Sequence, residues 1–313
     1  MITIASWPKR FTEPRFADIQ TKAIKSWQML SPDVEIILVG KDEGVAEVCA
    51  QMGLKHLPNV RANERGTIYL DDLLYQISLH ARHNIVAYVN ADIIVLPALA
   101  RAVSEVSKKW KRFLLVSAPH IADFTAIQVE PGFEKNALKH IVQQPTPYGA
   151  DIFVHTKGLY KKVKPFLVGR QIWDSWMMAY PAGKGIPCID ATEYAITLHP
   201  IDETSTHAYV HLQEGKKREE SWRKANDPLK VQEYEYNESM VTSWWFMHLH
   251  RTKLPYEIKP DGNISERNLS DKDIDIIRKI RSEDRKSFIK SLIKRVGLYN
   301  KVYDLYRIIK RNY

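Results

Sequence analysis

Short runs of aliphatic and β-branched residues alternate with longer segments of helical period from the start of the chain to about residue 200. The runs at residues 2–6 (ITIAS), 34–40 (VEIILVG) and 85–89 (IVAYV) are typical of strands. Between them, apolar residues such as Phe16, Ile19, Ala23 and Trp27 recur at helical spacing. The alternation predicts an α/β fold in which helices flank a mostly parallel sheet.

The same pattern continues beyond the third strand. Further helices are expected over residues 45–52, 68–81, 98–108 and 173–180, and further strands over 93–96, 112–117, 151–155, 187–191 and 194–199. Residues 119–148 lack strong periodicity and contain Pro131, Pro145 and Pro147 in addition to Pro119, which favours a long functional loop or an insertion.

The positive charge of the chain is concentrated at its C-terminus. The net charge is +9, and residues 285–313 hold nine Lys and Arg residues against one Asp, so residues 1–284 are nearly neutral. Because residues 1–284 carry almost no net charge, this distribution argues against a nucleic-acid-binding function for that part of the chain. We expect three parts: a sheet domain over 1–245, a charged helical or linker segment over 246–284, and a basic tail over 285–313.

The tail has the pattern of a basic amphipathic helix. Its apolar face repeats at three- and four-residue steps and is formed by Phe288, Leu292, Val296, Tyr299, Tyr303 and Tyr306. A helix of this kind can lie on an anionic membrane surface. The alternatives are a helix that docks on the domain and a helix that pairs with another protein.

Cysteine content and hydropathy indicate the compartment. The two cysteines, Cys49 and Cys188, are too few for a disulfide framework, which favours a reducing environment. The apolar run in MITIASWPKR is short for a signal peptide, and Asp92 interrupts the longest apolar stretch. We expect a cytoplasmic protein, held at the inner membrane face if the tail binds lipid.

Two polar residues stand inside the apolar stretch NIVAYVNADIIVL, at Asn90 and Asp92. The strand before them ends here, and open α/β sheets bind ligands outside the carboxyl ends of their strands. A carboxylate in this position can hold a divalent cation that also binds diphosphate oxygens. The alternative is a turn in which both side chains accept backbone N–H groups.

Seven short segments, taken in order, resemble the GT-A glycosyltransferases. They are TIASWPKR, ERGTIYLDDLLYQ, YVNADIIVL, YGADIFVH, VGRQIWDSWMM, CIDAT and LHPIDETSTHAYVH, and together they span roughly residues 1–215. The resemblance is nearest to enzymes of bacterial surface-polysaccharide synthesis (capsule and O-antigen) and to plant nucleotide-diphospho-sugar transferases. It implies a Rossmann-like GT-A sheet followed here by the basic helical extension.

The resemblance assigns the nucleotide side of the site. Asn90, Ala91 and Asp92 occupy the place of the D-x-D signature, which makes Asp92 the expected metal ligand and sets Asn90 near the ribose or a metal-bound water. Ala5, Ser6 and Trp7 fall where the first strand meets the base. For Trp7, stacking on the base competes with a role in the core.

Two charged residues before and within the third expected helix are also implicated. Arg65 would contact diphosphate or ribose, and Asp71 matches a position that faces the donor. The alternatives are a surface ion pair for Arg65 and a favourable acid in a first helical turn for Asp71.

The segment GRQIWDSW carries the chemistry implied on the acceptor side. Asp174 is nominated as general base of an inverting transfer, with Arg170 and Trp173 beside the sugar. The alternative is that Asp174 caps the helix that begins there and the tryptophans belong to the core. Asp151 is a second candidate carboxylate, against a plain turn acid.

Histidines gather after the last expected strand. His199, His207 and His211 lie close in sequence, and the resemblance implies that a late histidine completes the metal site, for which His199 and His207 are the candidates. Asp190 and Thr192 would support the site from their strand end.

Together these features predict a hexosyltransferase-type enzyme that uses Mn²⁺ or Mg²⁺ and moves sugar from a nucleotide-diphosphate donor to a glycan or lipid-linked acceptor. A sugar-phosphate nucleotidyltransferase is one alternative, although ASWPKRF lacks the glycine-rich loop which that class usually carries. A non-catalytic binding module that uses the basic tail is the other.

Overall fold

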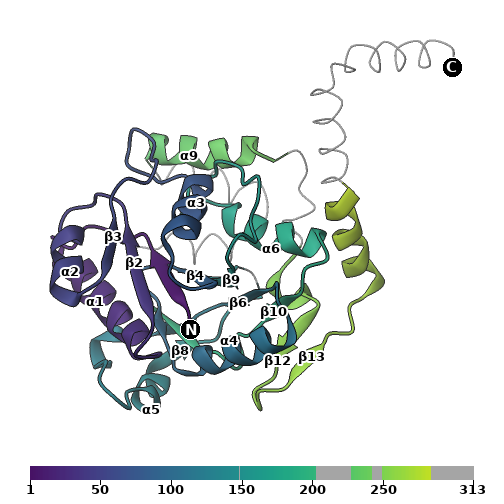
Figure 1. The fold of residues 1–313 in the computed structure, drawn as a ribbon, viewed down its shortest axis with the longest axis horizontal. Coiled ribbons are helices and arrows are strands. Elements are labelled where there is room, and N and C mark those ends of the chain that lie inside the picture. The colour runs from purple at the N-terminus through teal and green to yellow at the C-terminus, as the bar shows by residue number, and fades with distance from the viewer. Residues whose placement is uncertain (148, 202–226, 242–248, 283–313) are drawn as a thin grey trace, which may run out of the picture.

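The structure is a computed structural model, and it describes the chain except residues 148, 202–226, 242–248 and 283–313. The described residues form two sheets: a nine-stranded sheet that is covered by helices, and a smaller sheet of four strands (Figure 1). The predicted α/β class with a mostly parallel sheet is confirmed.

The nine-stranded sheet is parallel except around two strands. Across it, the order is β13 (Ile264–Glu266), β12 (Tyr256–Ile258), β10 (Cys188–Asp190), β6 (Leu114–Ser117), β9 (Ile152–Thr156), β4 (Ile85–Val89), β1 (Thr3–Ser6), β2 (Glu35–Val39) and β3 (Lys55–Leu57). β9 runs antiparallel to both β4 and β6, and β13 runs antiparallel to β12. The carboxyl ends of the parallel strands therefore share one edge with the amino end of β9.

Helices cover both faces of this sheet. They are α1 (Pro14–Gln28), α2 (Val45–Met52), α3 (Leu70–His80), α4 (Ala98–Lys109), α6 (Trp173–Gly183) and α9 (Pro228–Ser239). One core cluster joins the sheet to α3 and α6, and another joins it to α1, α2 and α4. Because β4 is buried on both sides, its side chains alternate between these two clusters and read as one apolar run. Figure 1 shows α9 beside α3, above the sheet.

Residues 119–148 are an insertion with its own secondary structure. In chain order it contains β7 (His120–Ala122), η1 (Phe124–Ala126), α5 (Glu134–Ala137), η2 (Leu138–His140) and β8 (Ile141–Gln143). The small sheet has the order β5 (Ile94–Val95), β11 (Thr197–Pro200), β7 and β8. Phe124, Ile127 and Phe133 form a small core with Leu198 of β11. The five elements within the insertion are three or four residues long, too short for sequence periodicity to reveal them.

The large sheet extends past the boundary expected at residue 245. β12 and β13 lie within the segment predicted to be helical or a linker, yet β12 pairs with β10 at the side of the sheet. The 3₁₀ helix η4 (Arg251–Lys253) precedes them, and Ile276 is 4% exposed within the α3 and α6 core cluster. The strands are three residues long and partly charged, so they carry no apolar run. The basic tail lies outside the described residues.

None of the helices in the described part of the chain is both long and apolar enough to span a bilayer.

Candidate active site

The turn after β4 carries Asn90, Ala91 and Asp92. It is closed by the N–H of Ile93, which donates to the carbonyl of Asn90 at 3.2 Å. β5 follows at once and pairs with β11 in the small sheet. The turn is therefore held between the two sheets, and Asn90 and Asp92 are both half-buried there.

β9 delivers Asp151 to the same place. Because β9 is antiparallel to β4, the residue before Ile152 lies beside the residue after Val89. The backbone N–H of Asn90 donates to the carbonyl of Asp151 at 3.1 Å, and the side-chain Nδ2 of Asn90 donates to Asp151 Oδ1 at 2.7 Å. The Asp151 N–H donates to the carbonyl of Ser117 at the end of β6 at 3.2 Å. Asp151 is thus fixed between two strand ends.

β11 brings His199 to Asp92. Nε2 of His199 lies 3.7 Å from Oδ2 of Asp92, and Nδ1 of His199 lies 2.8 Å from the carbonyl of Pro200. A carbonyl only accepts hydrogen bonds, so Nδ1 carries a proton and Nε2 is the ring nitrogen that faces Asp92. Metal-binding imidazoles are commonly oriented in this way, by a carbonyl at the other ring nitrogen.

Asp174 completes a group of acids at this edge. It lies in the first turn of α6, where it accepts the N–H of Ser175 at 2.8 Å, while Ile172 is the N-cap residue. A Cβ placed on Gly149 would lie 3.7 Å from Asp174 Oδ2, so this carboxylate lies against the turn that leads into Asp151. The sequence separates Asp92, Asp151 and Asp174 widely, and the fold brings them together.

Burial raises the pKa values of two of these acids, and the charges of neighbouring acids add to the shift of Asp151. Desolvation raises the pKa of Asp151 to about 6; the charges of Asp92 and Asp174 add to the rise, while His199 and the Asn90 amide oppose it. Desolvation also raises the pKa of Asp174, against the hydrogen bond from Ser175. Both groups therefore hold a proton more readily than an exposed aspartate.

Among the described residues, no group of three or more His, Cys, Asp or Glu side chains is arranged to hold a metal ion. Asp92 and His199 form a two-residue pair, and a cation between them would take its other ligands from a bound molecule or water. His207 and His211 lie outside the described residues.

The first strand contributes packing at this edge. Ala5 is fully buried within β1, and the hydroxyl of Ser6 donates to the carbonyl of Val89 at 2.6 Å, which ties the ends of β1 and β4 together. The indole N–H of Trp7 donates to Asp42 at 3.0 Å. A Cβ added to Gly40 would lie 3.0 Å from the Trp7 ring, so the ring packs closely on the end of β2.

The other charged candidates are held in ion pairs. Asp71 accepts Nη2 of Arg61 at 2.5 Å, and Nη2 of Arg65 lies 2.9 Å from Asp227, the N-cap residue of α9. Both pairs match the alternatives of a surface ion pair and a first-turn acid.

Arg170 and Trp173 also have protein partners. Nη2 of Arg170 lies 2.6 Å from Glu233 on α9. Trp173 is 5% exposed and packs edge-on against Tyr88 and in a tilted arrangement against Phe153, each at 5.5 Å between ring centroids. Its ring belongs to the core and offers no open face to a sugar.

A buried ionic cluster lies at the end of β10. Asp190 is 3% exposed; its Oδ2 accepts Arg251 at 2.8 Å and Arg267 at 2.9 Å, and its Oδ1 accepts the Thr192 hydroxyl at 2.6 Å. Arg251 also donates to the carbonyl of Thr146 at 2.8 Å, which ties the insertion to η4. The sequence predicted the supporting role of Asp190 and Thr192 but gave no sign of the two arginines.

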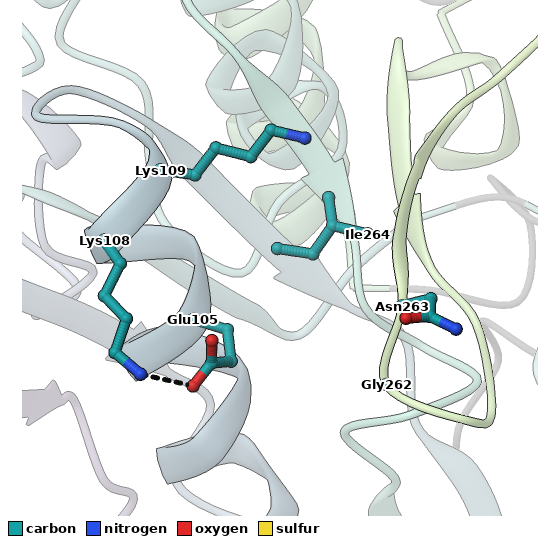
Figure 2. A pocket seen from close by; sticks show the side chains of 6 residues that line it. All are labelled: Glu105, Lys108, Lys109, Gly262, Asn263 and Ile264. Atoms are coloured by element: carbon teal, nitrogen blue, oxygen red, sulfur yellow. Dashed lines mark hydrogen bonds and ion pairs between the residues drawn. The ribbon is translucent and has the colours of Figure 1, made fainter.

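A separate surface cleft of about 380 Å³ lies between α4 and the turn joining β12 to β13 (Figure 2). It is lined by Glu105, Lys108, Lys109, Gly262, Asn263 and Ile264. Lys108 pairs with Glu105 at 2.7 Å, and Lys109 lies 4.8 Å from the centre of the Trp110 ring. None of the acids described above lines this cleft.

No protein-family model matches the chain, and no curated protein matches it. Among solved structures, a mannosyltransferase from Pyrobaculum calidifontis in complex with GDP-mannose and Mn²⁺ is 13% identical at a TM-score of 0.41, covering 98% of this chain and 82% of that one. Glucosyl-3-phosphoglycerate synthase from Mycobacterium tuberculosis in complex with Mn²⁺, UDP and glucosyl-3-phosphoglycerate is 12% identical at 0.42, covering 78% and 81%. A mycobacterial protein is 16% identical at 0.39, covering 64% of this chain, and this chain spans only 65% of its length. Likenesses this distant leave the function to be argued from the residues themselves.

Proposed function

We propose that the chain is a metal-dependent glycosyltransferase of GT-A architecture that transfers a sugar from a nucleotide-diphosphate donor to an acceptor hydroxyl. The observation that carries the proposal is the meeting of Asp92 and His199 with Asp151 and Asp174 at the carboxyl edge of the sheet. Open α/β sheets bind their ligands at this edge.

The Asp92 and His199 pair fits a divalent cation such as Mn²⁺ or Mg²⁺. One carboxylate oxygen and one imidazole nitrogen lie 3.7 Å apart, and the imidazole is oriented by the carbonyl of Pro200. A bound cation would neutralise charge that develops on the leaving diphosphate. With two protein ligands, most of its coordination sphere is left for phosphate oxygens and water.

Asp174 is the proposed general base. Its raised pKa makes it a stronger base than an exposed aspartate once it is ionised. The acceptor hydroxyl gives its proton to a carboxylate oxygen of Asp174 while its oxygen bonds to the anomeric carbon. The bond from that carbon to the diphosphate oxygen breaks, and the nucleoside diphosphate leaves. Direct displacement of this kind inverts the anomeric configuration.

The proposed biological setting is the synthesis of a bacterial surface polysaccharide, with a hexosyl donor and a glycan or lipid-linked acceptor. It rests on the motif resemblance and on the basic amphipathic pattern of residues 285–313, which would hold the enzyme at an anionic inner membrane face.

Thermal unfolding with UDP-glucose or GDP-mannose, each with and without Mn²⁺, tests the proposal. A true donor raises Tm by mass action, with about 2.7 kcal/mol of stabilisation at a concentration 100 times its Kd. The rise should require Mn²⁺ and disappear in Asp92→Asn. Glu105→Gln, in the cleft of Figure 2, is the matched control and should keep the full rise.

The proposal fails if no nucleotide sugar in a wider panel stabilises the protein with Mn²⁺. It also fails if the protein instead releases pyrophosphate from a nucleoside triphosphate and a sugar phosphate.

A further inference from the structure

Ile172, the residue before α6, has an unusual backbone conformation. Its φ is 86° and its ψ is −41°, and in the described part of the chain only Lys162 is another non-glycine residue with positive φ. This region is unfavourable for residues with a Cβ, and most of all for a β-branched one. Ile172 is 1% exposed, and Asp174 follows two residues later. Something must hold the chain in this conformation.

The peptide planes on both sides of Ile172 are fixed. On one side, Nδ2 of Asn237 on α9 donates to the carbonyl of Gln171 at 2.9 Å. On the other side, the Ile172 carbonyl accepts the N–H of Trp176 at 2.9 Å in the first turn of α6. Because φ and ψ are the rotations between these two planes, fixing both planes fixes the conformation of Ile172.

Asn237 is well suited to this task. Its side chain is fully buried, its Oδ1 accepts the Leu167 N–H at 2.7 Å, and its Nδ2 also donates to the Leu167 carbonyl at 2.9 Å. One amide therefore satisfies three backbone groups of the loop, and a side chain without both a donor and an acceptor would leave some of them unsatisfied.

α9 is itself tied firmly to the same loop. Glu233 accepts Nε of Arg170 at 2.7 Å and the Thr67 hydroxyl at 2.8 Å, and Glu238 accepts the side-chain amide of Gln171. Asn237 thus lies on a helix that is anchored to the loop on both sides of the contact with the Gln171 carbonyl.

We propose that Asn237 is a positioning residue: by holding the Gln171 carbonyl it keeps Ile172 at positive φ and so places Asp174 against the Gly149 turn beside Asp151. The inference rests on the proposed function for its catalytic consequence. Without Asn237, Ile172 returns to negative φ, the first turn of α6 shifts, and Asp174 moves out of reach of the acceptor hydroxyl.

The test begins with Asn237→Ala and Asn237→Asp in the full chain. The second variant keeps the acceptor for Leu167 and removes only the donors, so it serves if the first fails to fold. We expect kcat for release of nucleoside diphosphate from UDP-glucose or GDP-mannose with Mn²⁺ to fall about 100-fold, since a displacement of about 1 Å can cost this much. Donor binding should change less than about twofold, because Asp92 and His199 are untouched. Ser239→Ala, an exposed position on the same helix, is the control.

Ile172→Gly separates positioning from general damage. Glycine adopts positive φ without steric cost, so loss of Asn237 should reduce kcat about tenfold less in the Ile172→Gly background than in the native one. A crystal structure of Asn237→Ala gives a readout independent of activity, and φ at Ile172 should be negative. An unchanged kcat, an equal loss in both backgrounds, or a positive φ in that crystal overturns the inference.

These results are distinguishable from failure of the proposed function. Full turnover by Asp174→Asn would overturn the base assignment while leaving the crystallographic link between Asn237 and Ile172 to be judged separately.

Discussion

Asn90 is hydrogen-bonded twice to Asp151, once through its backbone N–H at 3.1 Å and once through its side-chain amide at 2.7 Å. This contact with Asp151 explains why residue 90 is an asparagine and not an aspartate. Two carboxylates at this distance would repel each other, whereas an amide donates to the oxygen of Asp151. Asn90 therefore joins β4 to β9 and leaves Asp92 as the acid of the turn.

Asn90→Asp should destabilise the metal-free protein, and more at pH 8 than at pH 5. The new carboxylate faces Asp151 and removes its donor, a change that costs about 1–3 kcal/mol. At pH 5 a proton shared by the two acids relieves the repulsion. Urea unfolding at both pH values measures the difference. Asn136→Asp, at an exposed amide, should show little pH dependence, and an equal loss at both pH values for Asn90→Asp would contradict the explanation.

Asp151→Asn should stabilise the metal-free protein above pH 6. The folded pKa of Asp151, about 6, exceeds the ordinary value of 3.8, so the folded state binds the proton more tightly. Stability from this group is complete below pH 4 and is lost as the pH rises through 6. The variant does not lose this stability. Its free energy of unfolding relative to the native protein therefore increases from pH 4 to above pH 6, by at most about 3 kcal/mol and by less with solvent screening. Thermal unfolding from pH 4 to 8 gives the profile, and a constant difference would refute it.

Asp174→Asn should lower kcat by a factor of about 10² to 10⁴ and leave donor binding nearly unchanged. In the native enzyme, the rate should fall as the pH drops through the raised pKa of Asp174, because the protonated acid cannot accept the acceptor's proton. Steady-state rates across pH, with donor titrations at a single pH, measure both effects. A variant that binds no donor would show instead that Asp174 belongs to the donor site.

Asp190→Ala should be strongly destabilising, by about 3–5 kcal/mol, since it leaves the buried Arg251 and the half-buried Arg267 without their shared carboxylate. Chemical unfolding measures the loss. Asp261→Ala, at an exposed turn, is the comparison and should cost little. A loss below about 1 kcal/mol would mean that the arginines find other partners.

Much of the site could be predicted because strand ends carry it. Asn90 and Asp92 follow a strand whose apolar run is unmistakable, and a site at the carboxyl ends of the strands is expected in such a sheet. Asp151 precedes another apolar run, but its place beside Asn90 depends on the antiparallel pairing of β9 with β4. His199 ends a third strand. These residues are visible in sequence because a polar side chain interrupts a buried run.

The rest depends on contacts that leave no local pattern. Asn237 and Glu233 lie on a helix more than sixty residues from the loop they hold, within a charged stretch that resembles any solvated surface. Arg251 precedes β12 and Arg267 follows β13, and both strands are three residues long with no apolar run. Trp173 looked like a sugar platform because sequence cannot tell an aromatic ring in the core from one at the surface.

Ser117 and Ile152 are register partners at the junction of β6 and β9, so the insertion between them departs from and returns to the same point of the sheet. The insertion is therefore a loop whose two ends are adjacent, and the entropy lost on closing such a loop depends only weakly on its length. Evolution can lengthen, trim or exchange it while Asp151 stays where it is, provided that β7 keeps its pairing with the strand of His199. Recombination between related chains at these two positions would therefore diversify the insertion without disturbing the acids.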